Sequence, residues 1–203
     1  MLSVKRLAMI AGLVVVGLAP AGAATAAPSA QDTQFLQGIH RANLVEISAG
    51  KMAQQKGANQ QVKELGEMLV TDHTKLDETV KSTASSVGVT LPDKPTNDQQ
   101  AVLNHLKGLN GSAFDNQWVS VELVAHMRAI ELAETEVAQG SDPAVVQVAQ
   151  NALPVLQEHY QELVNLAETL GVPIPEESGT PTPGSSSGRP SPATSGPSSP
   201  GRR

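Results

Sequence analysis

Cysteine is absent from the 203-residue chain, and aromatic residues are scarce. Without cysteine the protein forms neither disulfides nor thiolate metal sites. The aromatic residues are Phe35, Phe114, Trp118 and Tyr160, too few to stack the bases of a single-stranded nucleic acid. The net charge of −6 also repels phosphate backbones. We therefore expect no nucleic-acid partner.

Motifs of common enzyme classes are missing as well. Neither GxGxxG nor GxxxxGK[ST] occurs in the chain, which argues against a nucleotide-binding enzyme. No Ser–His–Asp order or paired-acid motif supports a hydrolase. The sequence therefore gives no specific support for an enzyme and leaves the question open. What it does contain is an acidic chain rich in Ala, Val and Leu, which favours helices.

The N-terminal residues 1–26 have the layout of a secretory signal peptide. Lys5 and Arg6 form a short basic region, residues 7–18 are almost wholly apolar, and small residues follow. The apolar run is too short to span a bilayer. We expect cleavage near Ala27, no transmembrane segment after processing, and secretion or retention in the cell envelope. An uncleaved membrane anchor is the alternative.

The C-terminal residues 176–203 consist mostly of Ser, Pro and Gly and contain no large apolar residue. Such a segment buries too little surface to offset its ordering entropy, so we expect it to be disordered. It can serve as a spacer that is glycosylated or that associates with cell-wall material. A tail without any selected role is the alternative.

Between these ends, residues 32–172 repeat apolar side chains at spacings of three and four, which predicts amphipathic helices. Four long helices are expected. The first is expected to begin at the cap Asp32 and to end at Gly57, and the second to begin at Asn59 and to end at Gly88. The third should begin at Ser112, in capping-box spacing with Asp115, and end at about Gln139. The fourth should begin at Ser141–Asp142–Pro143 and end at Gly171.

Connection lengths predict how these helices are arranged. The short connections at 57–58 and 140–142 make the first and second helices antiparallel neighbours, and likewise the third and fourth. The long connection, roughly 88–111, carries a short amphipathic stretch at 101–109. A four-helix bundle with one long crossover between helices two and three is the ferritin-like arrangement. The predicted fold is therefore an all-α ferritin-like bundle.

A polar residue lies close to the midpoint of each predicted helix, three of them directly in the apolar stripe and His126 beside its stripe. These residues are Glu46, His73, His126 and His159. Because an α-helix rises about 1.5 Å per residue, their side chains should lie at nearly one level of the bundle. Three further acids can reach this layer or its rim: Asp72, Glu122 and Glu158.

Buried imidazoles and carboxylates are costly unless each finds a partner. A proton-sharing Glu–His network is one solution. A single transition-metal ion, whether iron, zinc, copper or manganese, is the other. We expect Pro154 to kink the fourth helix five residues before His159, either to widen the layer or simply to shape the packing. His40 is expected on the surface, and His105 has no evident partner.

Several segments resemble the exported bacterial family catalogued as domain of unknown function 4142 (DUF4142). These segments are FLQGIHRANLVEISAGKMA, VKELGEMLVTDHTKLDE, GVTLP, FDNQWVSVELVAHMRAIELAETEVAQGSDPAV and LPVLQEHYQEL. The resemblance covers roughly residues 33–172 and implies a ferritin-like four-helix bundle whose activity is unknown. The Asp72–His73 pair and the Leu153–Pro154…His159 segment are its more specific parts.

A di-iron ferritin pattern has single Glu residues on two helices and Glu-x-x-His on the other two. Glu46 and Glu122 can fill the single positions, but Val70 and Leu156 stand where the paired motifs need carboxylates. A mononuclear site is therefore better supported than iron oxidation and storage.

The leading hypothesis is an exported bundle that binds one metal ion for metal handling or stress protection at the envelope. The main alternative is a non-enzymatic interaction or scaffold protein with a metal-free polar network. An oxidoreductase with a metal pair is a third, weaker hypothesis. The sequence does not indicate the oligomeric state.

Overall fold

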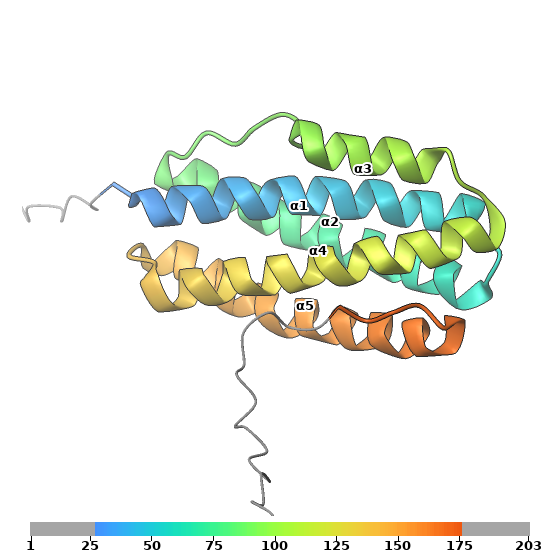
Figure 1. The fold of residues 1–203 in the computed structure, drawn as a ribbon. Helices are drawn as coiled ribbons and strands as arrows, with labels where there is room; N and C mark the ends of the chain where they lie inside the picture. The colour runs from blue at the N-terminus through green and yellow to red at the C-terminus, as the bar shows by residue number, and fades with distance from the viewer. Residues whose placement is uncertain (1–26, 176–203) are drawn as a thin grey trace, which may run out of the picture.

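The computed structural model describes residues 27–175, so the predicted signal peptide at 1–26 and the predicted tail at 176–203 lie outside it. Helices make up nearly all of the described part, and it contains no strand (Figure 1). The helices are α1 (Ala30–Lys56), α2 (Gln60–Val87), α3 (Asn97–Lys107), α4 (Gly111–Gln139) and α5 (Pro143–Leu170). Within residues 27–175, every helix falls short of the continuous apolar length that a bilayer crossing requires.

The four long helices form the predicted bundle. Tight turns join α1 to α2 and α4 to α5 as antiparallel pairs, and the two pairs pack together through α1 on α4 and α2 on α5. The connection from α2 to α4 runs the length of the bundle and carries α3, which lies outside along α1 (Figure 1). The all-α bundle with one long crossover is confirmed.

Most predicted helix ends are confirmed. Asn59 caps α2 and Asp142 caps α5, with Pro143 in the first turn. Gly88 and Gly171 end α2 and α5 in the left-handed conformation, at φ 76° and 69°. Glycine adopts this conformation without steric cost, which is why it stops helices so often.

The predicted start of α1 at Asp32 is wrong by three residues. Ser29 is the N-cap, and its Oγ accepts from the Asp32 amide at 3.1 Å. Asp32 is instead the third helical residue of a capping box, because its carboxylate accepts from the Ser29 amide at 2.6 Å. Ser29 and Asp32 thus form a capping box, and the sequence analysis missed it because Ser29 precedes the predicted bundle, which was expected to begin at residue 32.

The predicted capping box of Ser112 and Asp115 is also wrong. The helix begins at Gly111 after Asn110, which makes no side-chain cap. Asp115 is buried and accepts from the amides of Ala58 and Asn59, at distances of 2.8–3.2 Å. Its carboxylate therefore ties the α1–α2 turn to α4, a contact between segments that lie far apart in the sequence.

The bundle core consists of two apolar clusters. One contains Phe114, Trp118 and Leu69, and the Trp118 Nε1–H donates to the carbonyl of Ala49 at 3.2 Å. The other contains Phe35, Ile39 and Leu156. The level between the clusters is where the predicted polar residues lie.

Helices α1 and α2 pack closely, backbone against backbone, where Gly50 and Gly66 face each other. A Cβ atom on Gly50 would lie 2.6 Å from the carbonyl oxygen of Gly66, and one on Gly66 would lie 2.6 Å from the Ala53 Cβ. Any larger side chain would therefore push the two backbones apart. The close contact helps to bring Glu46, one turn before Gly50, and His73, two turns after Gly66, into the same layer.

Candidate metal centre

Five ionisable side chains from all four long helices meet between the two apolar clusters. Glu46 comes from α1, His73 from α2, Glu122 and His126 from α4, and His159 from α5. Each is at most 3% exposed. The structure thus brings together the four residues of the predicted layer and adds Glu122, which the sequence placed one helical turn before His126.

The three imidazoles form a compact triangle. Their ring centroids are separated by 5.5 Å (His73–His126), 5.3 Å (His73–His159) and 5.5 Å (His126–His159). One nitrogen from each ring lies within 4.8 Å of the other two. A triangle of this size can contract around a single ion with small side-chain rotations, because metal–nitrogen bonds are about 2.0–2.1 Å.

One nitrogen of each ring is held by an outer hydrogen bond. His73 Nδ1 donates to Asn43 Oδ1 at 2.9 Å, and His126 Nδ1 donates to the carbonyl of Glu122 at 3.0 Å. His159 Nε2 lies 3.4 Å from Asp72 Oδ2, at the rim of the layer. Such outer partners fix the tautomer and orientation of metal-binding histidines.

The remaining nitrogen of each ring has no partner. These atoms are His73 Nε2, His126 Nε2 and His159 Nδ1. Since the outer nitrogen carries the proton, each inner nitrogen presents a lone pair to the buried interior. Three bare lone pairs that face each other without a donor are costly, and a cation would satisfy all three at once.

The two carboxylates lie beside the triangle. Glu46, Glu122 and His126 form a second group of ligand atoms within 4.8 Å of one another. Burial, together with the charge and hydrogen bond of Glu46, raises the pKa of Glu122 well above its usual range. Burial alone would also raise the pKa of Glu46, but the hydrogen bond from Glu122 and the neighbouring imidazoles outweigh it and lower that pKa. The pair therefore carries one negative charge beside the imidazoles.

The protonation states of the imidazoles suit metal binding. Burial lowers the pKa of His73 to about 3 although the charge of Glu46 opposes the shift, and the neighbouring imidazoles add to the lowering. Burial and His126 lower the pKa of His159 as well. Both rings are therefore neutral near pH 7, which is the form that ligates metal ions.

Unpartnered buried polar atoms concentrate at this layer. Across residues 27–175 seven buried side-chain nitrogen or oxygen atoms lack a hydrogen bond, and five of them belong to the layer. A sixth is Asn43 Nδ2, on the outer partner of His73. Native proteins satisfy nearly all buried polar groups, so this concentration fits a ligand-binding centre. Three imidazoles and a carboxylate are a suitable donor set for a transition metal.

The other predicted site residues lie further out. Asp72 is at the rim, with its side chain 30% exposed, and it also contacts Lys75. Glu158 is exposed and belongs to neither group of ligand atoms. The sequence analysis missed Asn43, although it lies one helical turn before Glu46 on the same face of α1.

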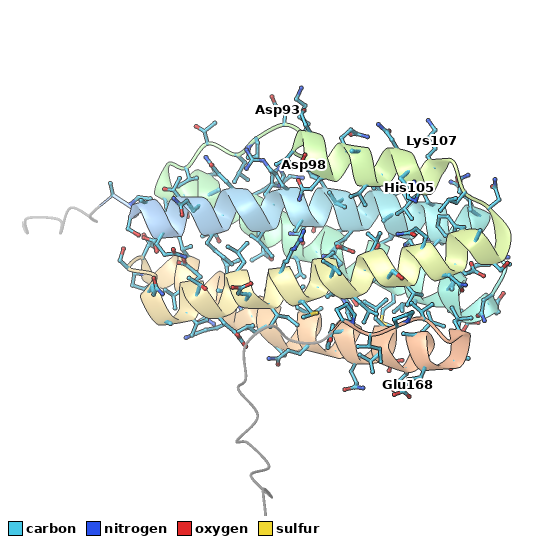
Figure 2. All side chains as sticks on the ribbon, in the orientation of Figure 1. Asp93, Asp98, His105, Lys107 and Glu168 are labelled. Carbon is cyan, nitrogen blue, oxygen red and sulfur yellow. The ribbon has the colours of Figure 1, made fainter. Side chains whose placement is uncertain are left out.

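The prediction that His40 lies on the surface is wrong. It is 4% exposed, and its Nδ1 lies 2.6 Å from Asp77 Oδ1 while its Nε2 lies 3.0 Å from the carbonyl of Pro92. The crossover covers this face of α1, which the helical period alone could not reveal. His105 is exposed, and Figure 2 shows it on α3 beside Lys107.

Three comparisons with known proteins bear on the chain. The family described as "Domain of unknown function (DUF4142)" matches residues 17–172. No curated protein matches. A DUF305 structure from Streptomyces coelicolor, described as a "putative secreted protein", has 11% identity and a TM-score of 0.62, covering 73% of this chain and 98% of its own. A DUF305 fragment from Deinococcus radiodurans has 12% identity and a TM-score of 0.62, covering 72% and 99%. At such identities these structures share the fold alone.

Proposed function

Because the chain belongs to the DUF4142 family, whose description assigns no activity, we propose its function from its own side chains: it binds one transition-metal ion in the bundle core. His73, His126 and His159 would supply three nitrogens and Glu46 an oxygen. The observation that carries this proposal is the set of three imidazole nitrogens without a hydrogen-bond partner, each on a ring whose other nitrogen has an outer partner.

The donor set narrows the choice of metal. Imidazole-rich sites suit zinc, copper and iron, whereas manganese prefers carboxylate and water ligands. An ion held by these side chains would be largely shielded from solvent, because every candidate ligand is at most 3% exposed, and of the four only Glu46 also borders the cavity between α1 and α4. Such enclosure supports metal storage, transfer or protection from metal stress rather than reaction with large substrates at the surface.

We also propose that this binding takes place outside the cytoplasm. The leader-like residues 1–26 support export through a cleavable signal peptide. A structure with the same fold is described as a "putative secreted protein". The Ser-, Pro- and Gly-rich residues 176–203 would then act as a spacer at the cell wall or envelope.

A metal-free scaffold is the second candidate function, and one observation favours it. Each imidazole already has one hydrogen-bond partner, and Glu46 and Glu122 can share a proton. In that case the layer would be a polar network that orders the core, and the bundle surface would bind a partner protein.

Metal content and thermal stability distinguish the two functions. The mature chain, from Ala27 to the C-terminus and without a histidine tag, would be stripped with chelator and titrated with zinc, copper and iron salts. An ion at a hundred times its dissociation constant adds about 2.7 kcal/mol, or about 5–10 °C in Tm for a bundle of this size. We expect one ion per chain and a shift of this size.

Two variants assign the ion to the layer. His73→Leu should abolish the stoichiometric ion, whereas His105→Leu, at an exposed position on α3, should keep it. Absence of binding by all three metals, or an ion that survives His73→Leu, would contradict the proposed site and leave the scaffold function.

A further inference from the structure

Among the outer partners of the three imidazoles, one reaches the solvent. Asn43 is fully buried, and the carbonyl that holds His126 belongs to Glu122, which is 1% exposed. Asp72, the outer partner of His159, has a side chain that is 30% exposed. Asp72 belongs to α2 and His159 to α5, and these two helices pack against each other. The candidate metal layer therefore has a direct polar contact with the solvent-exposed surface between α2 and α5.

The Asp72 carboxylate connects this surface to the layer through its two oxygens. Its Oδ1 accepts from Lys75 Nζ at 3.3 Å, and the Lys75 side chain is 71% exposed. Its Oδ2 accepts from His159 Nε2 at 3.4 Å, and the His159 side chain is 2% exposed. Exposed ion pairs contribute little to stability. A cation that arrives from solvent can therefore displace Lys75 from the carboxylate at small cost.

His159 has the longest outer hydrogen bond of the three imidazoles. The bond measures 3.4 Å, compared with 2.9 Å for His73 and 3.0 Å for His126. The other nitrogen of the ring, Nδ1, is buried in the layer without a partner. One ring thus has a nitrogen at the rim and a nitrogen in the interior. Rotation of this side chain would open the layer toward Asp72 and leave the other two imidazoles in place.

We propose that a hydrated divalent cation enters and leaves the layer between α2 and α5, with Asp72 as its first contact and His159 as the ligand that moves aside. This inference rests on the proposed metal binding and adds the route of exchange. The carboxylate of Asp72 attracts the cation and replaces part of its hydration shell. Once the cation lies among the inner nitrogens, His159 returns and donates to Asp72 again. Asp72 therefore controls how fast the site loads.

A cavity of about 440 Å³ between α1 and α4 is the other approach to the layer. Glu46 is the candidate ligand that lines it, and none of the three histidines does. The Glu46 Oε2 atom is buried, so a cation in this cavity would reach neither that oxygen nor an imidazole nitrogen. Arg128 also lines the cavity, and its positive charge repels cations. These features favour the route past Asp72.

Loading kinetics of the chelator-treated mature chain test this route. The protein would be mixed with zinc, copper(II) or iron(II) ions in a stopped-flow instrument, and a metal-responsive fluorescent indicator would report uptake. Transfer of the bound ion to excess EDTA would give the release rate. Asp72→Asn keeps an oxygen that can accept from His159 but removes the charge. We expect its association rate constant to fall at least about tenfold, with one ion still bound per chain.

The matched control is Glu158→Gln. Glu158 is exposed and precedes His159 directly, so this variant removes the same charge nearby without touching the outer bond of His159. Its association rate should change by less than about twofold. An equal slowing in both variants would overturn the inference, because it would report the general surface charge. Circular dichroism would confirm that each variant folds.

Two further results would overturn the route. An unchanged association rate with faster release in Asp72→Asn would mean that Asp72 only holds His159 in the occupied site. Slower loading in Ala42→Leu, which narrows the α1–α4 cavity, together with normal loading in Asp72→Asn, would place the route in that cavity. Both results leave one ion per wild-type chain. Failure of the wild type to bind any of the three ions at equilibrium would instead refute the metal site, and the route with it.

Discussion

Glu136, near the C-terminal end of α4, provides a quantitative test of the electrostatics. Its side chain is fully buried, and its Oε2 accepts from Gln31 Nε2 at 3.1 Å. Burial raises its pKa, and although the bond from Gln31 opposes this, the adjacent Asp32 adds to it and the pKa reaches about 7. Asp32 stays ionised because hydrogen bonds from Ser141 and Ser29 overcome its own burial and hold its pKa well below the usual range.

The direction of the pH effect follows from proton counts. Between pH 4.5 and 7 the folded protein holds a proton on Glu136 that the unfolded chain has released. The free energy of unfolding therefore falls as pH rises through this window and stays lower above pH 7. A shift from 4.5 to about 7, at about 1.4 kcal/mol per unit, makes the loss about 3 kcal/mol.

The substitution Glu136→Gln should remove this loss. Glutamine is neutral at every pH, its carbonyl can accept from Gln31, and its amide can donate to Asp32. Urea denaturation of chelator-treated protein should show no gap between variant and wild type at pH 4.5. The gap should grow to about 3 kcal/mol in favour of the variant at pH 8.

The control is Glu134→Gln, an exposed glutamate on the same helix. It removes the same charge from the surface and should change stability by less than about 0.5 kcal/mol at any pH. A gap between Glu136→Gln and wild type that stays constant from pH 4.5 to 8 would refute the reasoning, because a constant gap reports packing and not proton release.

Two further predictions concern packing. Gly50→Ala should lower the free energy of unfolding by at least about 2 kcal/mol in urea denaturation, because the new Cβ would lie 2.6 Å from the Gly66 carbonyl oxygen; a neutral result would show that α1 and α2 can separate freely. His40→Leu should cost about 2–3 kcal/mol, because it leaves Asp77 Oδ1 and the carbonyl of Pro92 unpaired, while Lys81 keeps its contact with Asp77 Oδ2. Amide hydrogen exchange should then accelerate in the α2–α3 connection, because the contact between His40 and the Pro92 carbonyl is lost. Unchanged exchange there would show that this contact does not hold the connection in place.

Local signals in the sequence were enough to predict the bundle. Glycines at 57, 88 and 171 and the caps at Asn59 and Asp142 act within one helical turn, so they can be recognised without tertiary information. The common level of Glu46, His73, His126 and His159 followed from helix midpoints alone, because antiparallel helices of similar length pack with their centres aligned.

Contacts between distant segments could not be predicted in this way. The position of Asp115 beside the α1–α2 turn depends on how α4 packs against α1, and the burial of His40 depends on where the crossover runs. A cavity between α1 and α4 likewise depends on small side chains, such as Gly38, Ala42 and Ala125, on two helices that face each other only in the folded bundle. Helical periodicity specifies a face but not what covers it.

The polar layer also divides the core into two apolar halves, and this has a consequence for how the helices align. Sliding one helix by a turn, about 5.4 Å, would move an imidazole or carboxylate among leucine and phenylalanine side chains. The apolar halves oppose such a shift less strongly, since Val, Leu and Ala recur along the helices, although the Gly50–Gly66 contact also favours one alignment of α1 and α2. The layer therefore favours one register of the helices over the others, as a buried asparagine does in a coiled coil. The same side chains that form the candidate site would then also select the correct alignment of the four long helices during folding.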